Sequence, residues 1–225
     1  MEETRATSIT SLITIPAVIT LGITILRLVG ELEHWPKPWF NEAAGGGGAI
    51  VGISWLPIIF GPYFAAKLTR AGEGPSSVGK AIGLALAGFV VVVLGGVIAG
   101  IAATKLNFNL AGTGFLVILI AGFIARLGWR ALGNVMFAYA FAARIPVLIV
   151  MFIAMRANGG LGWGTHYDVV PPNFHSLGFG VKFFYFALVP QMTLWIGFTV
   201  VVGSIFGAIA AAVAGRGKPA VAPAA

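Results

Sequence analysis

The segment ALGNVMFAYAFAARIPVLIVMFIAM, residues 131–155, decides the class of this protein. It holds a single charged side chain, Arg144, among its 25 residues. A helix needs about 20 apolar residues to cross a hydrocarbon core of about 30 Å. The segment therefore predicts a transmembrane helix.

The composition extends this interpretation to the whole chain. Of 225 residues, 58% are hydrophobic and 9% are charged, whereas roughly 25% are charged in an ordinary soluble domain. So few polar side chains do not cover a globule of this size, and apolar side chains must face lipid. A soluble protein is thereby excluded, and membrane lipid is the first partner that we expect.

The charge and the cysteine count exclude further classes. The net charge of +7 does not indicate a nucleic-acid partner, because the 14 bases are scattered in small groups between apolar runs and form no basic stripe. The chain has no cysteine. It therefore has no disulfide, no thiolate metal site and no cysteine nucleophile.

Six apolar runs bounded by charged or turn residues predict an all-α, polytopic integral membrane bundle of six transmembrane helices in a single domain. The runs cover about residues 8–29, 49–68, 78–104, 110–125, 131–155 and 178–214. Two long connections, 30–48 and 157–177, are too short to form a soluble domain. Residues 215–225, rich in proline and alanine, are expected to form a mobile tail.

The distribution of bases predicts the orientation. With the N-terminus inside, the inner segments hold Arg5, Lys67, Arg70, Lys80, Arg126, Arg130, Arg216 and Lys218, and the outer loops hold Arg27, Lys37, Lys105, Arg156 and Lys182. Lys and Arg are retained on the cytoplasmic side of a membrane. We therefore expect both termini to be cytoplasmic, with the protein in the plasma membrane.

The two long outer connections gather the titratable chemistry. All three histidines lie there with four carboxylates: His34, His166, His175, Glu31, Glu33, Glu42 and Asp168. Histidine and carboxylate together suit an acid/base pair or a metal such as zinc. The simpler alternative is that polar residues collect in loops because loops are wet.

Four of these residues are our candidate catalytic residues: His166, Asp168, His34 and Glu33. In the sequence GWGTHYD, residues 162–168, alternation places His166 and Asp168 on one side, where the carboxylate would orient the imidazole. Neither His-x-x-x-His nor His-Glu-x-x-His occurs. Metal and cofactor therefore stay undetermined.

Arg144 is the sharpest single feature of the sequence. A charge near the middle of a span costs about 2.5 to 3.5 kcal/mol on insertion scales, so the guanidinium must face protein, water or an anionic group. Pro146 frees a backbone carbonyl nearby. The functional interpretation is a midplane site for an anion, and the structural one is an arginine that ties helices together.

The first apolar run carries a polar stripe. Its members recur every three or four residues and share a helix face: Thr10, Thr14, Thr20, Thr24, Arg27 and Glu31. Thr14, Thr20 and Thr24 are therefore candidate ligand-binding residues that would line a cleft with Arg144. The alternative is that these threonines bond to their own helix or to a neighbour.

Small residues predict close helix packing, within the chain, across a homo-oligomer or in a larger membrane complex. They form stripes in two runs: Gly79, Gly83 and Ala87 with Gly96 and Gly100 in one, and Gly203, Gly207, Ala211 and Gly215 in the other.

Three hypotheses for the function follow. The first is a small-molecule, ion or lipid transporter or channel-like protein with a site at Arg144. The second is a membrane enzyme that uses the outer histidines and carboxylates. The third is a non-catalytic subunit of a larger complex. No P-loop, Gly-x-Ser-x-Gly elbow or dinucleotide fingerprint after a strand occurs.

Overall fold

A computed structural model describes residues 8–43, 48–105 and 107–215. The described residues form helices and connections without strands, which confirms the predicted all-α class. In chain order the elements are α1 (Ile9–Leu32), α2 (Leu56–Arg70), α3 (Val78–Thr104), α4 (Phe108–Gly128), α5 (Arg130–Gly160), η2 (Pro172–Phe174), α6 (Phe179–Phe183), η3 (Phe184–Leu188), α7 (Val189–Met192) and α8 (Leu194–Gly215). The predicted tail lies almost wholly outside the described residues.

Within the described ranges, five helical segments are long and apolar enough to cross a membrane. They are α1, α3, α4, α5 and the continuous run from α6 to α8. The protein is therefore a membrane-embedded helical bundle. These five correspond to five of the six apolar runs in the sequence.

The second predicted run differs, because only its later part is helical. Residues 48–55 form turns, and α2 starts at Leu56 with Pro57 in its first turn. Proline suits that position because its missing N–H is not needed there. The 15 residues of α2 span about 22 Å at 1.5 Å per residue, less than the hydrocarbon core.

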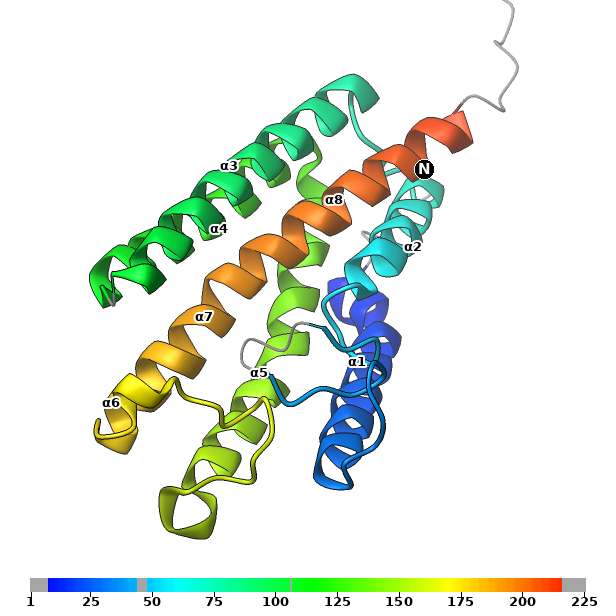
Figure 1. Cartoon of the computed structure of the whole chain (residues 1–225). Helices are drawn as coiled ribbons and strands as arrows, with labels where there is room; N and C mark the ends of the chain where they lie inside the picture. Colours follow the sequence, from blue (N-terminus) through cyan, green and yellow to red (C-terminus); the bar gives the residue numbers. More distant parts are fainter. Residues whose placement is uncertain (1–7, 44–47, 106, 216–225) are drawn as a thin grey trace, which may run out of the picture.

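The first and last helices of the bundle have their outermost ends, in chain order, on the same side. The start of α1 and the end of α8 lie at the same end (Figure 1). The end of α1, the α3–α4 connection, the end of α5 and the short α6 lie toward the opposite end, which we call the outer end (Figure 1).

The helix α8 crosses the bundle and contacts α2, α3, α4 and α5. It approaches α2 so closely that a Cβ added at Gly61 would strike the backbone of Gly203. Phe64, Leu132 and Met136 are fully buried beside this crossing. Close backbone approach at glycine is how membrane helices gain dispersion contacts.

The run from α6 to α8 is interrupted beside α5. The segment η3 is a π-helical turn, and Thr193 departs from helical geometry at φ −119° and ψ −72°. Pro190 lacks the N–H that would continue the ladder. Single π turns inside helices are frequent at functional sites. Gln191 lies in α7, beside this interruption, and is buried.

Candidate functional site

A cavity of about 980 Å³ lies between α1, α4, α5, the segment η3–α8 and the connection that follows α5. Its wall is mostly apolar, with aromatic rings from two sides: Phe115, Phe174, Phe184, Tyr185, Phe186 and Trp195. Polar side chains also line it, among them Arg27, Arg144, His166, Gln191, Thr24, Thr193, Asn107 and Asn109. A large apolar cavity with few polar groups is the usual form of a small-molecule site.

Arg144 lines this cavity from the middle of α5 and is 5% exposed. Its Nη1 donates one long hydrogen bond, 3.4 Å, to Oε1 of Gln191, and its Cζ lies 4.6 Å from the centroid of the Trp195 ring. Its buried Nε has no hydrogen-bond partner among the described residues, and Arg144 forms no ion pair there. The guanidinium therefore keeps donor capacity that the described part of the chain does not use.

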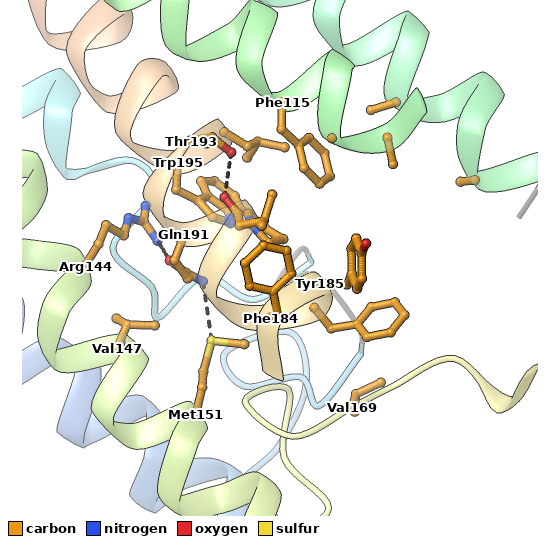
Figure 2. Close-up of a pocket in the computed structure, with 18 of the residues that line it drawn as sticks. Phe115, Arg144, Val147, Met151, Val169, Phe184, Tyr185, Gln191, Thr193 and Trp195 are labelled. Carbon is orange, nitrogen blue, oxygen red and sulfur yellow. Dashed lines mark hydrogen bonds between the residues drawn. The ribbon is translucent and has the colours of Figure 1, made fainter. Parts of the chain in front are cut away.

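Gln191 holds Arg144 in place. Figure 2 shows its side chain between Arg144 and Met151, with hydrogen bonds to both. The bond to Met151 is weak, with Nε2 of Gln191 3.6 Å from Sδ. Gln191, which belongs to α7, thus joins the last helical run to α5.

The threonines of the polar stripe of α1 have different surroundings. Thr24 lines the cavity and donates its hydroxyl to the carbonyl of Thr20. Thr20 is buried against Tyr139, with Oγ1 and the phenol oxygen 2.9 Å apart. Thr14 is exposed and bonds the carbonyl of Thr10. Of the four candidate ligand-binding residues, the cavity thus brings together Arg144 and Thr24.

A second polar group sits at the outer rim of the cavity. The Glu31 carboxylate, fully buried in the last turn of α1, accepts from Nε of Arg27 at 2.8 Å and from the backbone N–H of His166 at 2.9 Å. Nδ1 of His166 lies 2.7 Å from both carboxylate oxygens. We call these three residues the rim triad. Arg27 and His166 both line the cavity.

The turn before α6 positions His166 for this contact. Gly162 and Gly164 adopt positive φ, which other residues rarely do. The Asp168 carboxylate accepts from the N–H groups of Gly164 and Thr165 and from the Thr165 hydroxyl. Asp168 therefore closes the turn, and no hydrogen bond joins it to His166 within the described chain.

The other two candidate catalytic residues lie elsewhere on the outer end. Nδ1 of His34 is 3.6 Å from Oε1 of Glu42, and both this imidazole and the Glu33 side chain are exposed. Neither forms a hydrogen bond or ion pair with His166 in the part of the chain that the structure describes. In the same ranges, no group of three or more histidine, aspartate or glutamate side chains is placed to hold a metal ion.

Burial governs the titration of the rim. Burial lowers the pKa of His166 below its usual value, the positive Arg27 acts in the same direction, and the hydrogen bond to Glu31 opposes both. The neighbouring Tyr167 is buried, bonds the carbonyl of Thr24 through its hydroxyl and has a raised pKa. At neutral pH the imidazole is therefore neutral, with Nδ1–H directed at the carboxylate.

The sequence predicts Asp168 as the carboxylate partner of His166, whereas the structure gives it Glu31. Glu31 belongs both to the polar stripe of the first run and to the outer acids, but it is not among the predicted site residues. This is the feature of the sequence that points to the Glu31–His166 contact, because it places Glu31 where the polar stripe meets the outer connections.

The two small-residue stripes have different surroundings. In α8, Gly203 and Gly207 pack inside the chain against Met136, Leu132 and Gly61. In α3, a Cβ at Gly83, Gly96 or Gly100 would meet open space, and one at Gly79 would meet only Oγ of Ser77, at 3.9 Å. An intermolecular contact, in a homo-oligomer or larger complex, therefore stays a prediction for α3.

The arrangement combines one under-bonded cation, an aromatic wall and a carboxylate–imidazole pair around one cavity. It can bind an apolar molecule with an anionic group, and it can exchange a proton at the rim. No family model, curated protein or solved structure matches this chain.

Proposed function

We propose that this membrane protein binds an amphipathic molecule in the cavity, with the anionic group of the ligand at Arg144, as a transporter or lipid-handling protein would. The observation that carries the proposal is the guanidinium of Arg144: the residue lines a mostly apolar cavity, has no carboxylate partner in the described chain, and leaves its buried Nε without a hydrogen bond there. Buried donors in proteins are almost always bonded. A ligand oxygen would supply the missing acceptor.

The charge of the site favours an anion over a neutral ligand. Arg144 has no carboxylate partner in the described chain, and Gln191 and Trp195 contribute only dipoles and a ring face. A charge-assisted hydrogen bond is roughly twice as strong as a neutral one. The aromatic wall suits the apolar part of the same ligand, since a volume of about 980 Å³ lies at the upper end of small-molecule cavities.

The proposal includes the topology. We propose six crossings, with the short α2 as the sixth, and a plasma-membrane location with cytoplasmic termini. Two observations support it: the start of α1 and the end of α8 lie at the same end, and this topology places eight bases of the sequence inside, three of them in the terminal stretches, against five outside. In this orientation the rim triad faces the outer side and Arg144 lies deeper in the membrane.

The test is equilibrium binding to protein in phosphatidylcholine nanodiscs. The probes are 1-octanesulfonate, which stays charged between pH 5 and pH 8, and 1-octanol as its neutral counterpart. We expect the wild type to prefer the sulfonate. Arg144→Gln should weaken sulfonate binding about 10- to 100-fold, the equivalent of a hydrogen bond to a charged group, and leave octanol binding unchanged.

The control variant is Arg156→Gln, because Arg156 is exposed on the same helix and lies outside the cavity. It should bind both probes as the wild type does. A folded Arg144→Gln variant with wild-type affinity for the sulfonate would refute the proposal. If added phosphatidylglycerol competes with the sulfonate, the natural anion is a lipid headgroup. If it does not compete, the natural ligand is a free amphiphile.

A membrane enzyme is the second candidate, and the rim triad favours it. A buried carboxylate that orients an imidazole is the arrangement of a general base, and His166 lines the cavity. His166 would act on the bound molecule, with Asp168 as a positioning residue. The discriminating measurement is mass spectrometry of an octanoyl ester incubated with the protein: conversion by the wild type that is lost in His166→Gln would support this candidate.

A further inference from the structure

We propose that the rim triad is a proton-binding site whose occupancy is linked to the anion at Arg144, so that the protein takes up a proton at His166 when it binds its ligand. The inference rests on the proposed function and adds a second ion to it. The relevant geometry is the shared cavity: Arg144 and His166 both line it, one from α5 and one from the connection that follows α5.

The hydrogen bonds of His166 leave one ring nitrogen, Nε2, at which a proton can be gained or lost. Nδ1 is held by the Glu31 carboxylate at 2.7 Å, so this nitrogen carries the proton in the neutral ring. Nε2 has no hydrogen bond within the described chain, and it is not among the buried side-chain atoms without a partner. The side chain is 13% exposed. A proton from water can therefore add at Nε2 without breaking the bond to Glu31.

The charges around the imidazole determine the free-energy cost of adding this proton. On α1 are Arg27 and Glu31, which neutralise each other through a 2.8 Å ion pair. The connection contributes Asp168 and Tyr167, and α5 contributes Arg144, which acts on the same tyrosine. With a neutral imidazole the formal charges of Arg27, Glu31, Asp168 and Arg144 cancel. Protonation therefore leaves one uncompensated positive charge in a poorly hydrated place.

A bound anion lowers the free-energy cost of protonating His166. The negative group at Arg144 offsets one positive charge in the same cavity, where the dielectric constant is low and charges interact strongly. The anion therefore favours the imidazolium, and by thermodynamic reciprocity the imidazolium favours the anion by the same factor. The proton comes from bulk water and returns to it when the anion leaves, so the step needs no other reactant.

The linkage predicts a direction for the pH dependence. The affinity for a permanently charged anion should rise as the pH falls, because the bound state holds His166 protonated to a higher pH than the empty state. Couplings between sites are typically 5- to 150-fold. We expect sulfonate to bind about 5- to 10-fold tighter at pH 5.5 than at pH 7.5.

The experiment is calorimetric titration of 1-octanesulfonate into wild-type protein in phosphatidylcholine nanodiscs, at several pH values and in buffers of different ionisation enthalpy. The buffer dependence gives the number of protons taken up. We expect net uptake near pH 6 in the wild type, and neither uptake nor pH dependence in His166→Gln. His175→Gln is the matched control, since His175 is exposed and bonds the carbonyl of Val170, and it should behave as the wild type.

A second measurement does not require the His166→Gln variant to fold. In wild-type protein with ¹³C-labelled histidine rings, the titration of one ring should move to higher pH on addition of 1-octanesulfonate, and the other two should not move. Single His34→Gln and His175→Gln variants assign the rings. Sulfonate binding without proton uptake, or an unshifted His166 ring, would overturn the inference and leave the proposed function standing. Failure of the wild type to bind the sulfonate at any pH would overturn both.

Discussion

The carboxylate of Glu31 and the imidazole of His166, 135 residues apart in the chain, meet through two hydrogen-bonding atoms of the histidine, its backbone N–H at 2.9 Å and its Nδ1 at 2.7 Å. The contact fastens the connection after α5 onto the last turn of α1. Arg27 approaches the same carboxylate from one turn earlier. The outer rim of the cavity is therefore held by charge as well as by packing.

Removal of the carboxylate charge should destabilise the protein. Glu31→Gln leaves the shape intact but deprives the buried Arg27 of its counter-charge. Loss of one partner of a buried pair costs about 3 to 5 kcal/mol. We expect a clear drop in the thermal unfolding temperature in detergent. Glu33→Gln, exposed two residues later, should leave the temperature unchanged; equal effects of the two substitutions would contradict the structural role of the triad.

The lowered pKa of His166 predicts how stability without ligand depends on pH. The unfolded chain titrates near 6.5 and the folded protein at a lower pH, so the unfolded state binds more protons as the pH falls past 6.5. Stability should therefore decrease from pH 7.5 to pH 5.5. Thermal unfolding at each pH measures this slope. His166→Gln should flatten it, and an equally steep slope in that variant would assign the effect to other groups.

The close crossing of α2 and α8 predicts an effect of a single methyl group. At Gly61 an added Cβ meets the backbone of Gly203, which cannot move aside as a side chain can. Overpacking of this kind costs about 1 to 3 kcal/mol. Gly61→Ala should lower the unfolding temperature, measured by size-exclusion chromatography after heating. The control is Gly22→Ala on α1, where the added methyl group meets open space; a larger loss there would contradict the packing.

The absence of cysteine from the chain allows a direct test of the short α2 as a crossing. Ala43→Cys precedes α2 and Ser76→Cys follows it, and both positions are exposed. An impermeant maleimide added to intact cells should label Ala43→Cys and reach Ser76→Cys only after permeabilisation. Labelling of both in intact cells would show that α2 does not cross the membrane and would leave five spans.

The long spans were predictable because bilayer thickness sets a length that composition reveals. Five of the six apolar runs are continuous or nearly continuous helical segments, and Arg144 lines the cavity as its charge demands. The run 49–68 shows the limit of the argument. Hydropathy does not distinguish a helix from turns packed on a neighbouring helix. The apolar run begins at about residue 49, but α2 begins only at Leu56, with Pro57 in its first turn.

The pairing at the rim was less accessible from the sequence. Asp168, two residues from His166, was the nearer carboxylate, yet its oxygens are occupied by Gly164 and Thr165 of its own turn. Short-range bonds of this type form at little cost in chain entropy. Glu31 comes from a distant helix, so only the packing of α1 against α5 decides that it meets His166.

The threonine stripe illustrates the same limit. Periodicity placed Thr14, Thr20 and Thr24 on one face, but a helix face is wider than the cavity it borders. Each of the three hydroxyls bonds a carbonyl one turn earlier, which is the alternative use of threonine in a membrane helix. Only Thr24 also lies at the cavity wall.

A crystal structure of the protein with 8-bromooctane-1-sulfonate tests the central claim most directly, because bromine is located by its anomalous scattering. The account predicts sulfonate oxygens within 3.5 Å of the guanidinium of Arg144 and a bromine peak among the aromatic rings beside Phe115 and Phe184. A bromine peak on the lipid-facing side of α3, with Arg144 still bonded to Gln191 alone and no sulfonate in the cavity, would contradict it.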